Sequence, residues 1–365
     1  MKAKVASLAI LLSAFGFSSL QAQPEGDFSA VQRRISSIFE ENSAAVFRVI
    51  AAHATYDENG ELQNKQIHGT GCFISREGHI LASASVAQNS DRTWFIYDGV
   101  SYICELIGVE PTTNMALLKA NNLPLDFNFF FPEANQALPD IGSLAVMISC
   151  PLEFDPSPAL TMVAGTETRF AKREFATTLL RINSVTRGGE SGAPLVGLNG
   201  RFLGIQVATT SKEIGFSYVL PARAVLRVRD DLLFAGKFIH GWIGIDIRAR
   251  STIRDGRQIY LTSLLPGSPA EVAGLFPNDI LVRMGDFNIK TFSDVSNAMF
   301  FARVGQFLDV QVFRDGVLHD FTVKVIERPK DPPLRPVPAE VTNPTEDSNA
   351  VPERRNRKSL LEESS

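Results

Sequence analysis

The sequence contains few cysteines, no strongly basic block in its body, and no long apolar run after its first twenty residues. The three cysteines (Cys72, Cys104 and Cys150) are an odd number, and none has the Cys/His spacing of a zinc site. We therefore expect buried cysteines, of which at least one is unpaired, and neither a metal nor a cofactor. The net charge is -4, and binding to nucleic acid usually requires a positively charged surface, so the composition does not favour that function.

The first 22 residues are predicted to be a signal peptide. Lys2 and Lys4 precede an apolar run from Val5 to Phe17, and a region of small residues then ends at Ala22. The alternative is a membrane anchor, but the run is shorter than the ~20 apolar residues that a spanning helix needs. We expect an exported protein, periplasmic or extracellular, without a stable membrane anchor.

The length of the chain and the pattern of its apolar runs predict two folded domains with additional terminal segments. A short amphipathic helix is expected in residues 23–43. Short apolar runs then recur about every ten residues through residues 44–225, with turn signals at Asn59-Gly60, Asp98-Gly99 and Asn199-Gly200. This texture is typical of an all-β barrel or sandwich.

The remainder of the chain differs from this β-rich part. A linker helix is predicted at residues 226–240, and strands alternate with two helical segments in residues 241–327, which indicates a small α+β domain. Residues 328–365 are rich in proline and charge, so we expect a disordered tail.

One local motif carries chemistry. Gly188-Gly189-Glu190-Ser191-Gly192 places a serine in a glycine-rich turn before the apolar strand that begins near Ala193. Such a turn can present the Ser191 hydroxyl, and the N–H groups of Gly189 and Ser191 can converge on a developing oxyanion. Taken alone, the motif is equally compatible with an ordinary β-turn.

Several motifs in order resemble the HtrA/Deg family of exported trypsin-like proteases. The family's serine motif, Gly-Asn-Ser-Gly-Gly-Pro-Leu-Val, is similar to residues 189–196, and its Gly-Phe-Ala-Ile-Pro is similar to residues 215–221. Its Gly-Ser-Gly-Phe-Ile-Ile resembles residues 69–74. The resemblance implies a mainly β fold, with a trypsin-like double β-barrel followed by a small α+β PDZ domain.

The other two positions of the catalytic triad depart from the family pattern. Ser85 stands where the family's histidine is expected, in the string Gly78 to Ala87, and Asn114 stands where its aspartate is expected. A serine hydroxyl is a poor nucleophile without a base, so the resemblance implies an inactive protease. An active serine endopeptidase that uses Ser191 with a non-standard base is the alternative, although no histidine has a sequence argument for reaching Ser191. The sequence alone does not decide whether the chain is an enzyme.

The α+β domain contains the string Trp242-Ile243-Gly244-Ile245, which resembles the carboxylate-binding loop of the family's PDZ domain. Its N–H groups are expected to hold the C-terminal carboxylate of a peptide that adds as a strand. The expected function is therefore an adaptor or holdase in protein quality control, which binds unfolded proteins or C-terminal peptides. The resemblance also implies a homo- or hetero-trimer, formed through aromatic residues such as Phe28 and Phe39.

Overall fold

The computed structural model describes residues 26–329, except 57–58, 171–172, 210–214 and 253–255. The predicted signal peptide, and the predicted tail from residue 330 onward, lie outside the described residues. Among the helices in the described ranges, none is both long enough and apolar enough to cross a membrane.

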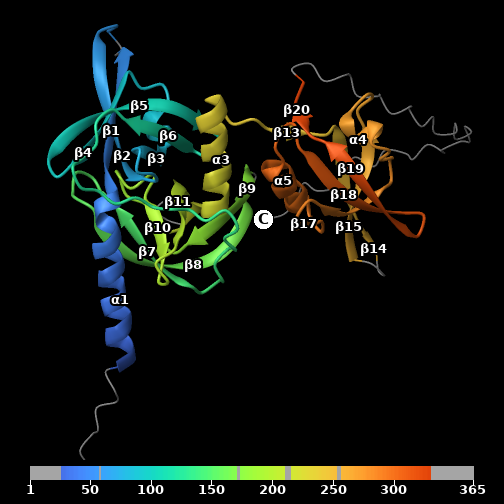
Figure 1. Ribbon diagram of the computed structural model, residues 1–365, viewed down its shortest axis with the longest axis horizontal. Helices are drawn as coiled ribbons and strands as arrows, with labels where there is room; N and C mark the ends of the chain where they lie inside the picture. Colours follow the sequence, from blue (N-terminus) through green and yellow to red (C-terminus); the bar gives the residue numbers. More distant parts are fainter. Residues whose placement is uncertain (1–25, 57–58, 171–172, 210–214, 253–255, 330–365) are drawn as a thin grey trace, which may run out of the picture.

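The first part of the chain forms two closed six-stranded barrels (Figure 1). The strands of the first barrel follow the order β1-β2-β3-β6-β5-β4, and those of the second follow β10-β11-β12-β9-β8-β7. The first barrel contains β1 (Val46–Tyr56), β2 (Leu62–Phe73), β3 (His79–Ser83), β4 (Arg92–Tyr97), β5 (Val100–Glu110) and β6 (Met115–Ala120). The second contains β7 (Leu144–Ser149), β8 (Ser157–Phe170), β9 (Arg173–Ile182), β10 (Pro194–Gly197), β11 (Phe202–Thr209) and β12 (Ser217–Pro221).

The helices of this part lie at its ends and at one turn. Helix α1 (Gly26–Asn42) leads through the short 3-10 helix η1 (Ser43–Ala45) into β1, and it extends away from the barrels in Figure 1. Phe28 on α1 is 82% exposed, whereas Phe39 packs against the core between the barrels. A single helical turn, α2 (Ala84–Ala87), follows β3.

The predicted linker helix at residues 226–240 differs from the helix observed. Helix α3 spans Ala222–Ala235, so it begins directly after Pro221, and it ends because Gly236 takes the left-handed conformation with φ of 67°. Ala224, Val225, Val228 and Leu232 are buried in the core between the barrels. The helix is therefore a packed part of the double barrel rather than a free linker.

Residues 241–327 form a C-terminal domain around a six-stranded sheet. Five of its strands follow the order β14-β15-β16-β18-β19, the short β17 pairs with β16, and β13 and β20 form a separate pair. In this order β14 is an edge strand. The elements are β13 (Gly241–Trp242), β14 (Ile245–Thr252), β15 (Gly256–Leu264), α4 (Pro269–Val272), β16 (Ile280–Met284), β17 (Phe287–Asn288), α5 (Phe292–Phe301), β18 (Phe307–Arg314), β19 (Val317–Lys324) and β20 (Ile326–Glu327).

Helix α5 begins where the sequence favours it, because Thr291 and Asp294 form a reciprocal capping box. Its Val295, Ala298 and the following Ala302 are buried in the core of the C-terminal domain, whereas Phe300 joins the core of the double barrel. The same helix therefore belongs to both hydrophobic cores and lies between the barrels and the rest of the C-terminal domain (Figure 1).

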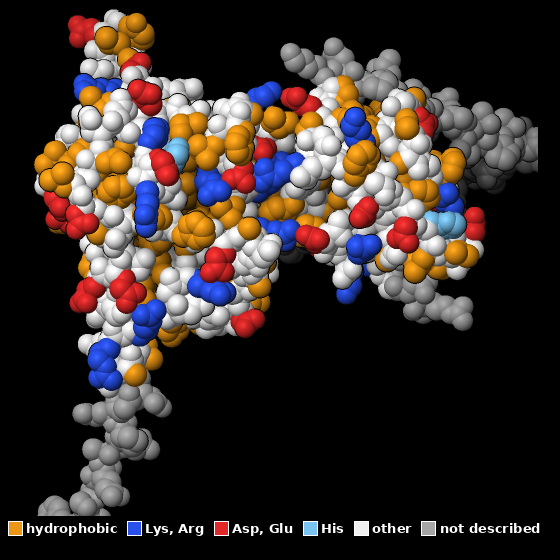
Figure 2. Space-filling model, viewed as in Figure 1, with side chains coloured by type: hydrophobic (Ala, Val, Ile, Leu, Met, Phe, Trp, Pro, Cys, Tyr) orange, Lys and Arg blue, Asp and Glu red, His pale blue; other side chains and the backbone are white. Residues whose placement is uncertain are grey.

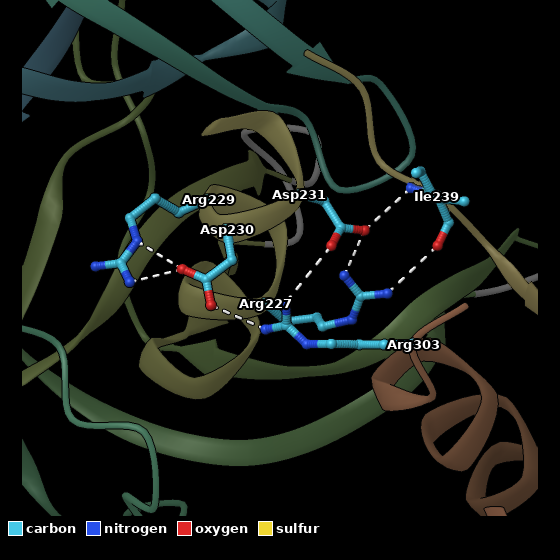
Figure 3. Close-up of polar contacts among 6 residues, drawn as sticks. All are labelled: Arg227, Arg229, Asp230, Asp231, Ile239 and Arg303. Carbon is cyan, nitrogen blue, oxygen red and sulfur yellow. Dashed lines mark hydrogen bonds and ion pairs between the residues drawn. The ribbon is translucent and has the colours of Figure 1, made fainter. Parts of the chain in front are cut away.

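Charged side chains also cross this boundary, where positive and negative groups gather on the surface (Figure 2). Figure 3 shows Arg303, just after α5, paired with Asp230 at 2.9 Å and with Asp231 at 3.7 Å. Asp231 also accepts a hydrogen bond from the Ile239 N–H at 3.1 Å and pairs with Arg227, which is almost fully buried. These contacts attach the end of α3 to the C-terminal domain.

The structure confirms the predicted fold class, a mainly β chain with a double barrel followed by a smaller domain. It also confirms the prediction for the cysteines, because Cys72, Cys104 and Cys150 are buried free thiols. Burial raises the pKa of Cys104 and of Cys150 to about 12, and it raises the pKa of Cys72 further.

Candidate functional site: a serine turn between the barrels and a carboxylate loop

The serine turn, residues 188–192, projects from the second barrel and is held by Thr70 on β2 of the first. The Thr70 N–H donates to the Ser191 carbonyl at 2.9 Å, and the Thr70 hydroxyl donates to the Gly189 carbonyl at 2.8 Å. The Cys150 N–H in turn donates to the Thr70 hydroxyl oxygen at 2.9 Å. Thr70 is fully buried, so these bonds form in the interior, where they are not exchanged for bonds to water.

Two glycines allow the turn to pack this closely. Gly189 has φ of 88°, and a Cβ there would lie 2.6 Å from the Cys150 carbonyl oxygen. Gly192 has φ of 94°, and its Cβ would lie 2.3 Å from the Thr70 carbonyl oxygen. Any side chain at either position would clash with backbone atoms that cannot move aside.

Two backbone N–H groups of the turn are unpaired within the described residues. Within the described ranges, neither the Gly189 N–H nor the Ser191 N–H donates a hydrogen bond, and the Ser191 hydroxyl has no partner. Glu190 is only 3% exposed, and its carboxylate accepts hydrogen bonds from the Arg187 N–H at 2.5 Å and from the Ser149 hydroxyl at 3.2 Å. Glu190 therefore pairs away from the Ser191 hydroxyl.

Ser85 and Asn114 lie together beside this turn. Ser85 lies on the single turn of α2 and not on an extended strand, and its N–H donates to the Asn114 side-chain oxygen at 2.8 Å. A Cβ at Gly192 would lie 3.0 Å from the N–H nitrogen of Ser83, at the end of β3. The strand that leads to Ser85 therefore meets the turn that carries Ser191.

The side chains at these two positions are occupied by neutral partners. The hydroxyls of Ser85 and Ser83 are hydrogen-bonded at 2.7 Å, and the Asn114 amide nitrogen donates to the Val207 carbonyl at 2.6 Å. Neither serine nor asparagine can accept a proton at neutral pH. Among the described residues, no hydrogen bond joins a histidine to Ser191.

Two of the histidines near the barrels have other hydrogen-bond partners, and a third lines a cleft beside the serine turn. His53 contacts the Val86 carbonyl at 3.1 Å, and the ring of His79 is hydrogen-bonded to the Ser75 hydroxyl at 2.7 Å. Burial, followed by the charge of Lys119, lowers the pKa of His79. His68 is half-buried and lines an open cleft of about 920 Å³ together with Leu152, Phe154, Gly188 and Gly189.

The predicted carboxylate loop, Trp242 to Ile245, connects β13 with the edge strand β14. Its carbonyl groups are fixed, because Ile243 accepts from the Ala270 N–H at 3.0 Å and Gly244 accepts from the Leu265 N–H at 3.0 Å. In the described part of the chain, the N–H groups of Ile243 and Gly244 donate no hydrogen bond although both residues are buried. A buried N–H without an acceptor is rare and costs about 1–3 kcal/mol, so the loop is suited to bind an anionic group.

Comparison with known proteins assigns both domains. The trypsin-like peptidase domain family matches residues 69–205, and the PDZ domain family matches residues 241–325. The probable periplasmic serine endoprotease DegP-like of Chlamydia trachomatis serovar D is 24% identical over 280 residues, which are 74% of this chain and 56% of that protein. A protein of Marinomonas sp. with the same description is 28% identical over 277 residues, or 72% of this chain and 58% of that protein.

The chain thus combines a trypsin-like peptidase domain with one PDZ domain, and the relatives named above are described as DegP-like serine endoproteases. The chain spans a little more than half the length of these relatives. Among solved structures, the HtrA-type protease AlgW with a tripeptide has a TM-score of 0.64 at 20% identity, covering 81% of this chain and 98% of that one. The serine endoprotease from Yersinia pestis has a TM-score of 0.54 at 21% identity, again covering 81% and 98%.

Two residues of this HtrA-like chain were not found by sequence reasoning. Thr70 holds the serine turn through both of its polar groups, yet a threonine between two glycines gives no distinctive sequence signal. His68 lines the cleft beside Gly189 because β2 alternates: Thr70 and His68 project to the same face, two residues apart. The sequence predicts that His68 and Thr70 share one face of the strand, but it does not predict that this face lies against the serine turn.

Proposed function

We propose that this protein is an exported HtrA-like binding protein that does not cleave its ligands. It holds unfolded or C-terminally exposed segments through its PDZ domain and acts as an adaptor or holdase in protein quality control. The observation that carries this proposal is the hydrogen bond between the Ser85 N–H and the Asn114 amide beside the serine turn. Ser85 and Asn114 occupy the places of the base and its aspartate, and neither can take the proton of Ser191.

The chemistry that remains is binding without turnover. The free N–H groups of Gly189 and Ser191 can still hold a peptide carbonyl, but the barrier to attack by an unactivated hydroxyl remains. Loss of triad function in a serine protease lowers turnover on the order of 10⁶-fold. A bound segment therefore leaves intact.

Peptide binding is assigned to the loop from Trp242 to Ile245 and to the free edge of β14. The structure of the HtrA-type protease AlgW contains a bound tripeptide, which supports a peptide-binding role by analogy with a protein of the same fold. The peptide carboxylate would accept from the free N–H groups of Ile243 and Gly244, and the peptide backbone would extend the sheet at β14.

Substitution of Gly244 tests this assignment. Gly244 has φ of 80°, and a Cβ there would lie 2.3 Å from the Ser268 Cβ, so Gly244→Ala should displace the loop and abolish binding of a fluorescent peptide with a free C-terminus. Gly316→Ala is the control, since Gly316 has φ of 86° with nothing within 4 Å of the added Cβ. Equal binding by wild type and Gly244→Ala, or by the free and the amidated peptide, would contradict the assignment.

A second candidate function is an active serine endopeptidase, and the position of His68 favours it. His68 lines the cleft beside Gly188 and Gly189, so it is the histidine to test as a non-standard base. This candidate predicts that a fluorophosphonate probe labels Ser191 in the wild-type protein and fails to label the His68→Ala variant. Absence of labelling in the wild type eliminates it.

Assembly into a homo- or hetero-trimer is proposed through the exposed Phe28 of α1. Because Phe39 packs against its own chain, Phe28 is the better anchor. Sedimentation of the protein as a monomer at micromolar concentration would contradict a homotrimer.

A further inference from the structure

The outward face of the edge strand β14 carries two arginines at alternate positions, Arg248 and Arg250, and both are exposed. Successive side chains of a strand point to opposite faces. Ile245, Ile247 and Ala249 accordingly pack against the core of the domain, while Arg248 and Arg250 project from the other face. Their cross-strand neighbours on β15 are Tyr260 and Gln258.

Neither guanidinium group has an acidic partner among the residues that the structure describes. In the described ranges Arg248 forms neither an ion pair nor a side-chain hydrogen bond. Arg250 donates to the Gln258 side-chain oxygen at 3.1 Å, and its guanidinium lies 5.2 Å from the centre of the Tyr260 ring. Arg250 is therefore oriented by uncharged neighbours, with its terminal nitrogens still available.

Strand β14 also carries an acidic residue, Asp246, on the same face as the two arginines and nearer the carboxylate loop. Asp246 is half-buried and accepts a hydrogen bond from the Ser263 hydroxyl at 2.8 Å. Along the outward face, charge thus changes from negative at Asp246 to positive at Arg248 and Arg250.

We propose that the PDZ domain selects C-terminal peptides with acidic side chains at the third and fifth positions before the C-terminal residue. This inference rests on the proposed peptide binding at β14. If the C-terminal residue lies opposite Ile245, an antiparallel strand places its third preceding residue opposite Arg248 and its fifth opposite Arg250. Residues directly opposite on one face of a sheet lie about 4.5–5.5 Å apart, and pairs of opposite charge stabilise such a sheet.

The other positions follow from the same register. The residue immediately before the C-terminus lies opposite Asp246, so an acidic side chain there is disfavoured. The C-terminal residue and the second and fourth residues before it face the half-buried side chains of Ile245, Ile247 and Ala249, which favours apolar groups. The proposed ligand is therefore an extended segment with an apolar end and alternating acidic residues upstream.

The test uses two ten-residue peptides, each labelled with fluorescein at its N-terminus and ending in valine with a free carboxylate. One carries glutamate at the third and fifth positions before the valine, and the other carries glutamine there. Binding to the full chain with Ser191→Ala, which prevents cleavage, is followed by fluorescence anisotropy at low salt and at 0.5 M salt. We expect each glutamate to tighten Kd about two- to fivefold at low salt, with most of that gain lost at high salt.

Arginine variants identify the source of the preference. In Arg248→Gln with Arg250→Gln, the two peptides should bind equally well. Arg283→Gln is the matched control, because Arg283 is an exposed arginine on β16, away from the edge strand, and it should keep the preference. A preference that survives in the double variant overturns the inference.

The outcomes also separate this inference from the proposed function. If both peptides bind equally to the unchanged arginine face, and amidation of their C-termini abolishes binding, the charge preference is wrong while peptide binding stands. If neither peptide binds, peptide binding and the charge preference are both wrong.

Discussion

At the scale of single residues, the Asn114 side chain makes one hydrogen bond as an acceptor and one as a donor, which an amide can do and a carboxylate cannot. Its oxygen faces a donor, the Ser85 N–H, and its nitrogen faces an acceptor, the Val207 carbonyl. Its φ of 54° lies in the left-handed region, which asparagine tolerates better than most residues. A carboxylate here would satisfy the first contact and place two acceptors against each other in the second.

Asn114→Asp should therefore destabilise the protein, because the carbonyl of the buried Val207 would lose its donor. The usual cost of a buried group that loses its partner is about 1–3 kcal/mol. Urea denaturation measures the change. Asn128→Asp is the control, because the Asn128 amide also donates to a backbone carbonyl, that of Glu41, but is exposed to water. Equal stability of Asn114→Asp and wild type would show that the amide is not required by the fold.

The three thiols provide a second prediction at this scale. Burial raises the pKa of Cys104 and Cys150 to about 12, so iodoacetamide at pH 8 should leave the folded protein unlabelled and label all three thiols after unfolding. Unfolded thiols ionise near pH 8.5, well below the folded values. The free energy of unfolding should consequently fall as pH rises above about 8.5. Rapid labelling of the native protein would contradict the burial of these residues.

The sequence predicted the serine turn but not all the contacts that hold it. The glycine spacing identified Gly189 and Ser191 because left-handed glycines leave a local pattern. The contribution of Thr70 depends on a contact between two barrels, across 119 residues of chain, and no local pattern encodes such a contact. The pairing of Ser85 with Asn114 was implied by the family resemblance and not by the spacing of the residues.

At the scale of elements, helix α5 of the C-terminal domain packs against the double barrel and forms hydrogen bonds with it. Asn297 on α5 accepts hydrogen bonds from the Thr177 hydroxyl and the Thr178 N–H, both at 2.8 Å, and donates to the Thr178 hydroxyl at 2.7 Å. Asn297 is 8% exposed, so its amide links α5 to β9 in a largely dry contact. Ser293, one turn earlier, donates to the Thr168 hydroxyl at 2.7 Å.

Asn297→Ala should weaken this contact. The substitution leaves the buried Thr177 hydroxyl and the half-buried Thr178 N–H without their acceptor. The usual cost for a buried group that loses its partner is about 1–3 kcal/mol. Thermal unfolding should show a lower Tm, or two separate transitions if the domains uncouple. Ser296→Ala serves as the control, since the Ser296 hydroxyl lies on the same helix but only contacts its own turn. Identical single transitions for Asn297→Ala and wild type would contradict this role.

Element boundaries were predicted best where a local signal exists. The capping box of Thr291 and Asp294 marks the start of α5. At the predicted turn Asp98-Gly99 both residues have the positive φ expected of a hairpin, whereas at Asn199-Gly200 only Gly200 does. The bounds of α3 were predicted less well. Its apolar residues pack on both barrels, so tertiary contacts and the left-handed Gly236 determine where the helix begins and ends.

At the scale of the whole molecule, the chain combines a double barrel, a serine turn and a PDZ domain, while Ser85 and Asn114 offer no base. The fold requires Gly189, Gly192 and Thr70 to close the barrels against each other, so these residues can persist without catalysis. Binding at the edge of β14 needs none of the three. The architecture is thus compatible with a protein that captures peptides and releases them intact.

Cleavage of casein by the wild-type protein and by Ser191→Ala in parallel tests this account most directly. The account predicts no cleavage by the wild type above the level of Ser191→Ala, because neither Ser85 nor Asn114 can take the hydroxyl proton. Cleavage that is present in the wild type and lost in Ser191→Ala would contradict it, and would mean that another residue serves as the base.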